Sequence, residues 1–439
     1  MKHQSSDVYS SMILLYYLSK VAGLAPFKLV NVQASEKKGK TCLRLKKGSV
    51  FEIAQSILMI FIILTAASCI VILNYKLPNN QRNYLILEML LTVATSIACL
   101  ILCMTKISRN IDSILYKIKI LDGILMVSEE THNKNIKNNI IHISIVLCIF
   151  VSRNVYDFWV WKIYWNLWNP FLYTIYLCEF VHLITIAQFV NFVMLLKQKL
   201  HCINLHLSSP MENSEEFFSE NIWENLLRSS NFPNFSIFKK DLRIYEFHEA
   251  MNKHCSDTVQ IWIGTSTKIN SFGKEKSQIR ALEILYYFIY EICSRINLMY
   301  QVQILMFTTS TFVELTSNLY YTFVTIKSIA SFDMIEAIYA METFVWALLD
   351  FMLLFCITGS CNKITQESWR TSCLLQKLLL LPGIDAITCD ELKLFLDLVK
   401  EKQVKFTVCG FFTLNFTVLS SIIGAVTTLL VIFVQFNPN

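Results

Sequence analysis

TTLLVIFVQFNPN, residues 427–439, closes the sequence with an uncharged apolar run followed by an amide and an aromatic residue, Gln435 and Phe436. The run belongs to a longer apolar window at 411–436. About 20 mainly apolar residues are enough for a helix to cross the hydrocarbon core of a bilayer. This window therefore predicts a membrane-spanning helix, and the amide and phenyl ring at its far end need an explanation.

The whole chain has the composition of an integral membrane protein. Apolar residues make up 54% of its 439 residues, charged residues make up 16%, and the mean hydropathy is +0.45. Backbone polar groups in lipid must bond within their own segment, so long apolar windows predict helices. We expect an all-α membrane protein with seven transmembrane helices, near 50–73, 84–104, 139–162, 170–196, 298–326, 335–358 and 411–436.

The distribution of Lys and Arg predicts how these helices cross the membrane. Most of these residues lie in 1–49, 105–138, 197–297 and 359–405, whereas the connections on the opposite side carry few. Positive residues are retained in the cytoplasm, so we expect a cytoplasmic N-terminus and an extracellular C-terminus. This orientation is the reverse of that of a G-protein-coupled receptor. The expected location is the cell membrane, as a multi-pass protein.

The same windows divide the chain into segments. We expect a cytoplasmic segment at 1–49, spans one to six at 50–358 with a long cytoplasmic loop at 197–297, a cytoplasmic anchor segment at 359–410, the seventh span at 411–436 and an extracellular tail at 437–439. Spans four and five keep a helical periodicity beyond the membrane, and 385–405 is amphipathic with Asp385 as a possible N-cap. These helices predict a cytoplasmic bundle.

Four of the spans carry polar residues at helical spacing, in what the orientation makes their outer halves. An ionisable residue in a span costs several kcal/mol unless it meets a partner or water, so each is a candidate for function. On this basis the candidate ligand-binding residues are Arg153, Asp157 and Trp161 in span three, Glu179 and His182 in span four, Asn318 and Tyr321 in span five, and Glu342, Trp346 and Asp350 in span six.

Two interpretations of these residues stay open. In one, Arg153 pairs with Asp157 or Glu179 and the other polar groups only hold helices together. In the other, they line a water-filled pocket that suits a polyhydroxylated ligand. Trp346 can cover the apolar face of a sugar while carboxylates and amides bond its hydroxyls.

The C-terminal run resembles the signature of insect gustatory receptors, a Thr-Tyr pair, five apolar residues and Gln-Phe. Thr428, the run 430–434, Gln435 and Phe436 occupy matching positions, and Leu429 replaces the tyrosine. A second stretch, YYLSKVAGLAPF at 16–27, is similar to the N-terminal segment of the fructose-receptor branch. The general sweet-receptor branch carries Glu where this chain has Leu430, which favours the fructose-type branch.

This resemblance implies a tetrameric ligand-gated cation channel whose seventh spans surround a central pore. It implies a homotetramer in membrane lipid, a small polar tastant such as fructose or another sugar as ligand, and cations as the permeating species. Gln435 and Phe436 would form the gate, and the pore stripe would contain Thr428, Val431 and Gln435, which share a helix face. The alternative is that Gln435 caps a helix at the interface and Phe436 joins an aromatic belt.

Two other classes of function fit the sequence less well. A secondary transporter would carry a small polar solute through Gly- and Pro-interrupted spans, but the chain has 10 Gly, and its seven Pro fall in loops or at span ends. An enzyme is disfavoured because no phosphate loop, catalytic triad pattern or zinc spacing occurs. We expect no cofactor, no metal and no nucleic-acid partner.

Overall fold

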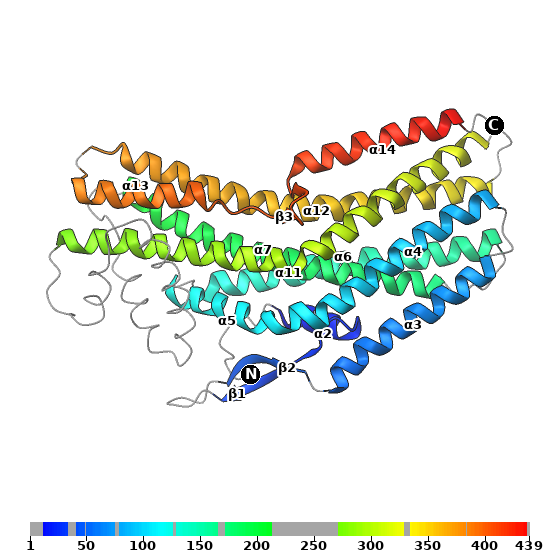
Figure 1. The fold of residues 1–439 in the computed structure, drawn as a ribbon, viewed down its shortest axis with the longest axis horizontal. Helices are drawn as coiled ribbons and strands as arrows, with labels where there is room; N and C mark the ends of the chain where they lie inside the picture. Colours follow the sequence, from blue (N-terminus) through cyan, green and yellow to red (C-terminus); the bar gives the residue numbers. More distant parts are fainter. Residues whose placement is uncertain are drawn as a thin grey trace.

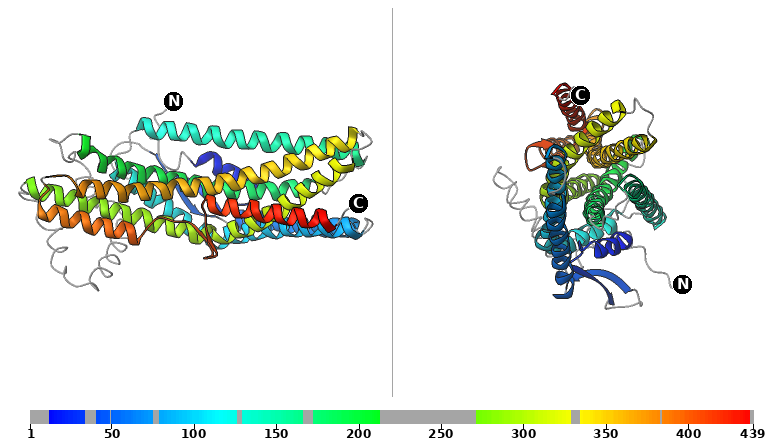
Figure 2. Two further views of the ribbon diagram at one scale, coloured as in Figure 1. Left: turned by 90° about the horizontal axis from the view of Figure 1, so that it is seen from above. Right: turned by 90° about the vertical axis from the view of Figure 1, so that its right-hand side faces the viewer.

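The computed structural model describes residues 12–33, 41–48, 50–74, 79–125, 129–165, 172–212, 271–328, 334–382 and 384–436. Within these ranges the chain is almost entirely helical, and long helices run roughly along one axis (Figures 1 and 2). The main helices are α3 (Val50–Asn74), α4 (Asn79–Leu102), α5 (Ser108–Ile124), α6 (Glu129–Trp165), α7 (Leu172–Glu212), α11 (Ser271–Ser328), α12 (Met334–Leu379), α13 (Ala386–Glu401) and α14 (Phe416–Phe436).

Six described helical segments are long and apolar enough to cross a membrane. They lie at Val50–Ser68, Met89–Ile124, Ile143–Val160, Tyr173–Ser208, Ala340–Leu379 and Phe416–Gln435. The expected fifth span, 298–326, is part of α11 but is not among them, because polar residues such as Gln303, Ser310 and Glu314 lower its hydropathy. These three side chains are buried in the bundle, so neighbouring helices shield them from lipid. The chain is a multi-pass membrane protein.

α11 occupies the interior of the bundle. It packs against α4, α7, α12, α13 and α14. The main core is built mainly from apolar side chains of α4, α5, α7, α11, α12 and α13 and of the N-terminal segment, including the fully buried Phe192, Ile289 and Phe395. The ends of α3, α6, α11 and α14 gather at one end of the molecule, on the right in Figure 1, and α13 lies at the other.

Two expectations about the helices beyond the spans are confirmed. α7 continues to Glu212 and α11 begins at Ser271, so both run well past their apolar windows. α13 forms where the amphipathic pattern predicted a helix, and Asp385 is its N-cap, with its carboxylate accepting a hydrogen bond from the backbone N–H of Thr388 at 3.2 Å.

The expected loop at 105–138 is wrong for most of its length. A π-helical turn, η1 (Cys103–Ile107), joins α4 directly to α5, and α6 has already begun at Glu129. Ile111, Ile114, Leu115 and Ile118 are buried at spacings of three, four and seven, which places them on one face of α5. The charged residues between them kept this amphipathic helix out of the apolar windows that were identified in the sequence.

The N-terminal segment folds back onto the bundle. α2 (Ile13–Val21) is followed by two antiparallel strands, β1 (Phe27–Gln33) and β2 (Thr41–Lys47). Gly23, with a positive φ of 72°, permits the tight exit from α2, and its carbonyl accepts a hydrogen bond from Ser56 of α3 at 2.6 Å. No pattern in the sequence predicted this hairpin.

The last helix starts later than expected. Residues 407–413 form a short hairpin of β3 (Thr407–Val408) and β4 (Phe412–Thr413), whose turn contains Cys409 and Gly410 at positive φ. Asn415 then caps α14 by accepting a hydrogen bond from the backbone N–H of Thr417 at 3.1 Å. The seventh helix therefore begins at Phe416, not at 411.

Candidate functional site

The predicted polar residues of α6 and α12 come together around Arg153. This side chain is only 7% exposed. Its guanidinium carbon lies 3.1 Å from the ring centroid of Trp346 on α12 and 5.8 Å from that of Phe150 on α6. A guanidinium over an indole face gains cation–π attraction, and the gain grows when water is excluded. The arrangement brings a cation and an aromatic ring from two helices into one site.

Arg153 does not form the ion pair that the simpler interpretation required. Among the described residues it has no salt bridge, and its Nε and Nη2 atoms are buried without a hydrogen-bond partner. Buried polar groups of this kind are costly to leave unpaired. Two N–H-bearing nitrogens are therefore available to an acceptor that the described residues do not supply.

Two carboxyl groups complete this cluster. Asp157, one turn after Arg153 on α6, accepts a hydrogen bond from the hydroxyl of Tyr176 on α7. Glu342, one turn before Trp346 on α12, lies close to both Asp157 and Trp346. Asp157 and Glu342 are 2% and 5% exposed. The cluster thus combines acceptors, unpartnered donors and an aromatic ring, a set that suits a small polar molecule.

A second polar group of side chains lies next to the first, between α4, α7 and α11. His182 contacts the hydroxyl of Ser96 at 2.9 Å through Nε2 and lies 4.0 Å from Glu179 through Nδ1. Glu314 accepts hydrogen bonds from Thr92 at 2.7 Å and from Ser310 at 2.6 Å. Glu179 lies near both Arg153 and Glu314, between the two groups of polar side chains.

The remaining predicted residues are less informative. Asp350 is buried one turn beyond Trp346 on α12. On α11, Tyr321 packs against Tyr320, and the carbonyl of Asn318 accepts a hydrogen bond from Thr322. The side chain of Trp161 lies outside the described part of the chain.

Sequence reasoning missed the hydroxyl partners of the site. Tyr176 could have been found, because it precedes Glu179 by three residues and so shares its helix face. Thr92, Ser96 and Ser310 carried no such signal. Small hydroxyl side chains in spans commonly bond their own helix, as Ser96 also does to the carbonyl of Thr92 at 3.0 Å.

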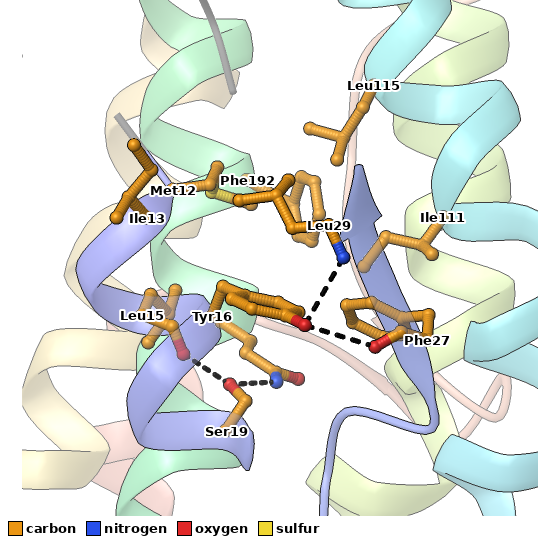
Figure 3. Close-up of a pocket in the computed structure, with 11 residues that line it drawn as sticks. Met12, Ile13, Leu15, Tyr16, Ser19, Phe27, Leu29, Ile111, Leu115 and Phe192 are labelled. Carbon is orange, nitrogen blue, oxygen red and sulfur yellow. Dashed lines mark hydrogen bonds between the residues drawn. The ribbon is translucent and has the colours of Figure 1, made fainter. Parts of the chain in front are cut away.

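A cavity near the N-terminus has a different character. Its volume is ≈30 Å³. It lies between α2, β1, α5 and α7 and is lined mainly by apolar side chains (Figure 3). The hydroxyl of Tyr16 already donates to the carbonyl of Phe27 at 3.3 Å and accepts from the backbone N–H of Leu29 at 3.2 Å. This cavity mainly reflects how the N-terminal segment packs.

The predicted pore residues occupy the side of α14 that faces away from the bundle. Leu419 and Val426 are buried, and Val426 lies in a small cluster with Leu315 and Ala347 of the neighbouring helices. Gly424, Thr428, Val431 and Gln435 are exposed on the opposite side of the helix. α14 ends at Phe436, whose side chain lies outside the described part.

Comparison with known proteins identifies the family to which this architecture belongs. Residues 12–439, nearly the whole chain, match the family described as 7tm chemosensory receptor. The chain belongs to this family. It is a chemosensory receptor, not an enzyme. A comparison with the curated proteins finds no match.

Solved structures carry the same fold as this receptor. The insect olfactory receptor OR5 from Machilis hrabei matches with a TM-score of 0.59 and 13% identity over 97% of both chains. The structure of the same receptor in complex with eugenol matches with a TM-score of 0.60 and 12% identity over 98% of both chains. At these identities the likeness shows the shared fold, that of an insect chemoreceptor.

Proposed function

We propose that the chain is a gustatory receptor that acts as a ligand-gated, non-selective cation channel in the cell membrane. Its ligand is a small polar tastant, a sugar such as fructose, bound within each subunit. The observation that carries the proposal is the buried guanidinium of Arg153, which stacks on Trp346 beside Asp157 and Glu342 and has two nitrogens without partners among the described residues.

The chemistry of this cluster favours a hydroxylated ligand. Sugar hydroxyls accept hydrogen bonds from the Arg153 nitrogens and donate to carboxylates such as Asp157 and Glu342. Arg153 already covers one face of the Trp346 indole, so a sugar ring stacks on the opposite face, or on the same face after Arg153 moves. The eugenol complex of the olfactory relative supports a small molecule as the class of ligand for this fold.

The rest of the proposal concerns assembly and conduction. Four copies place α14 around a central pore, with Thr428, Val431 and Gln435 lining it and Phe436 closing its outer end. The exposed, uncharged side of α14 supports this arrangement. The stripe holds no charged ring, so discrimination among monovalent cations is poor. The N-terminus lies in the cytoplasm and the C-terminus outside, as the distribution of Lys and Arg indicates.

The test is to express the full chain in cells and record currents while applying D-fructose, D-glucose, sucrose and eugenol. We expect an inward current with at least one sugar. Trp346→Ala and Glu342→Ala should abolish it without reducing surface expression, because both side chains form the cluster. Phe344→Ala is the matched control, since Phe344 lies between them on α12 but is 47% exposed.

Three outcomes would contradict the proposal. Responses to eugenol but to no sugar would point to an odorant-type ligand. Saturable sugar uptake without current would point to a transporter. Wild-type responses in both the Trp346 and Glu342 variants would show that the ligand binds elsewhere.

A further inference from the structure

Two buried hydrogen-bond networks approach each other in the middle of the bundle. The first includes His182 and Ser96, beside Glu179. In the second, Tyr300 of α11 donates to the amide oxygen of Gln188 on α7 at 3.2 Å, and the Gln188 amide donates to Ser19 of α2 at 2.7 Å. Ser19, labelled in Figure 3, in turn donates to the carbonyl of Leu15. The second network therefore ties the N-terminal helix to the core.

Gln303 of α11 lies between these networks. Its side chain is 1% exposed, and neither its amide nitrogen nor its amide oxygen has a hydrogen-bond partner among the described residues. It lines a cavity together with His182 of the first network and Tyr300 of the second. The volume that the centre of a water-sized sphere can reach in this cavity is ≈10 Å³. One water molecule needs about this volume.

The polar groups around the cavity determine what can occupy it. Thr95 and Thr185 also line it, but their hydroxyl protons are already donated to the carbonyls of Leu91 and Val181, each at 2.8 Å. The hydroxyl proton of Tyr300 is donated to Gln188. These three oxygens retain lone pairs and can only accept. The amide oxygen of Gln303 needs a donor, and its nitrogen needs an acceptor.

We propose that this cavity is an internal water site, and that the water joins the two networks through Gln303. Water both donates and accepts, so it satisfies the amide oxygen and the amide nitrogen together. A sodium ion would satisfy only the oxygens, and no carboxylate lines the cavity to balance its buried charge. His182 lines the cavity from the first network and Tyr300 lines it from the second, so the water lies between the two networks.

The direct test is a cryo-electron microscopy map of the wild-type protein at a resolution that shows other internal waters. We expect a density peak within hydrogen-bonding distance of the Gln303 amide and of at least one hydroxyl of Thr95, Thr185 or Tyr300. A map that shows other internal waters but no peak at this position overturns the proposal. The apparent melting temperature of the purified protein should not change when choline replaces sodium, and a decrease would indicate a cation instead.

A variant separates a water-bridged amide from an unpartnered one. Gln303→Met keeps the length of the side chain and removes both polar atoms. If a water bridges Gln303, the variant leaves that water and its hydroxyl neighbours short of a partner, and the apparent melting temperature falls by several degrees. If the amide is unpartnered, an apolar replacement leaves the melting temperature unchanged or raises it, and the proposal fails.

Two further variants test the link between the networks. Ile304→Leu is the packing control, because Ile304 lines the same cavity without a polar group. If Ile304→Leu lowers the melting temperature as much as Gln303→Met does, packing alone explains the decrease and the proposal is overturned. Combining Gln303→Met with Gln188→Met should lower the melting temperature by less than the sum of the single changes. Additive changes would show that the networks are separate.

Discussion

At the scale of single residues, Arg153 carries a buried charge, and one face of its guanidinium stacks on the indole ring of Trp346. We expect Arg153→Met to raise the half-maximal concentration of an active sugar at least tenfold, because a hydrogen bond to a charged group contributes about 1.5–3 kcal/mol. Arg153→Lys should also weaken the response, since an ammonium group cannot reproduce the flat stack on Trp346. Concentration–response curves of the two variants measure these effects.

Lys162 provides the control for charge at this position. It lies on the same helix, α6, but is exposed, so Lys162→Met should leave the concentration–response curve unchanged. An Arg153→Met variant that responds like the wild type would place the ligand away from this cluster and leave the stack with a structural role.

At the scale of elements, α13 depends on its N-cap. The hydrogen bond from Thr388 holds the pKa of the Asp385 carboxyl below its ordinary value. A depressed pKa means that Asp385 stabilises the folded state above about pH 4, and that this contribution is lost as the pH falls through the lower folded-state pKa. Asp385→Ala should speed amide hydrogen exchange in the first turn of α13 at pH 7.

Asp385→Asn separates the charge of the cap from its hydrogen bond. Asn is also a good N-cap residue, so this variant should protect the first turn of α13 better than Asp385→Ala and should lose the acid sensitivity. Equal exchange rates in the wild type and both variants would mean that other contacts hold the helix end.

α14 supports a different prediction, about conduction. Phe436→Ala should raise the current without ligand, because an apolar ring that closes a pore excludes water. Gln435→Ala should lower the conductance or change the ion preference without altering ligand affinity. Unliganded currents and reversal potentials measure both effects. Wild-type behaviour in both variants would identify these residues as an interfacial cap.

At the scale of the whole molecule, the exposed side of α14 is the surface through which the proposed tetramer would assemble. Only 17% of its membrane window is buried, and a groove of ≈560 Å³ separates its first turns from α11. We expect native mass spectrometry of the detergent-solubilised protein to show four copies of the 51.0 kDa chain. Gly424→Trp should reduce the tetramer, because a Cβ at Gly424 meets only open space within the subunit and the bulk would project into the assembly. A monomer in the wild type would contradict the proposed pore.

The sequence predicted what short-range physics controls. Apolar windows located the membrane helices, and a side chain three residues before a helical N–H identified the cap at Asp385. The same reasoning could not pair Arg153 with Trp346, because their contact joins two helices and depends on how these pack. It also missed η1 and the β1–β2 hairpin, whose conformations are set by contacts with α2, α3 and the bundle rather than by local periodicity.

The separate cluster that holds α14 has a consequence for how such receptors can change. Val426 meets Leu315 and Ala347 in a small set of side chains apart from the main core. In the proposed channel, the ligand-binding helices and the conducting helix therefore meet through only a small cluster of buried side chains. A chimera that carries the last helix of a related receptor, with Val426 and Leu419 retained, should fold and keep its tastant while acquiring the donor's permeation. Ligand recognition and ion permeation can then change independently of each other within one chain.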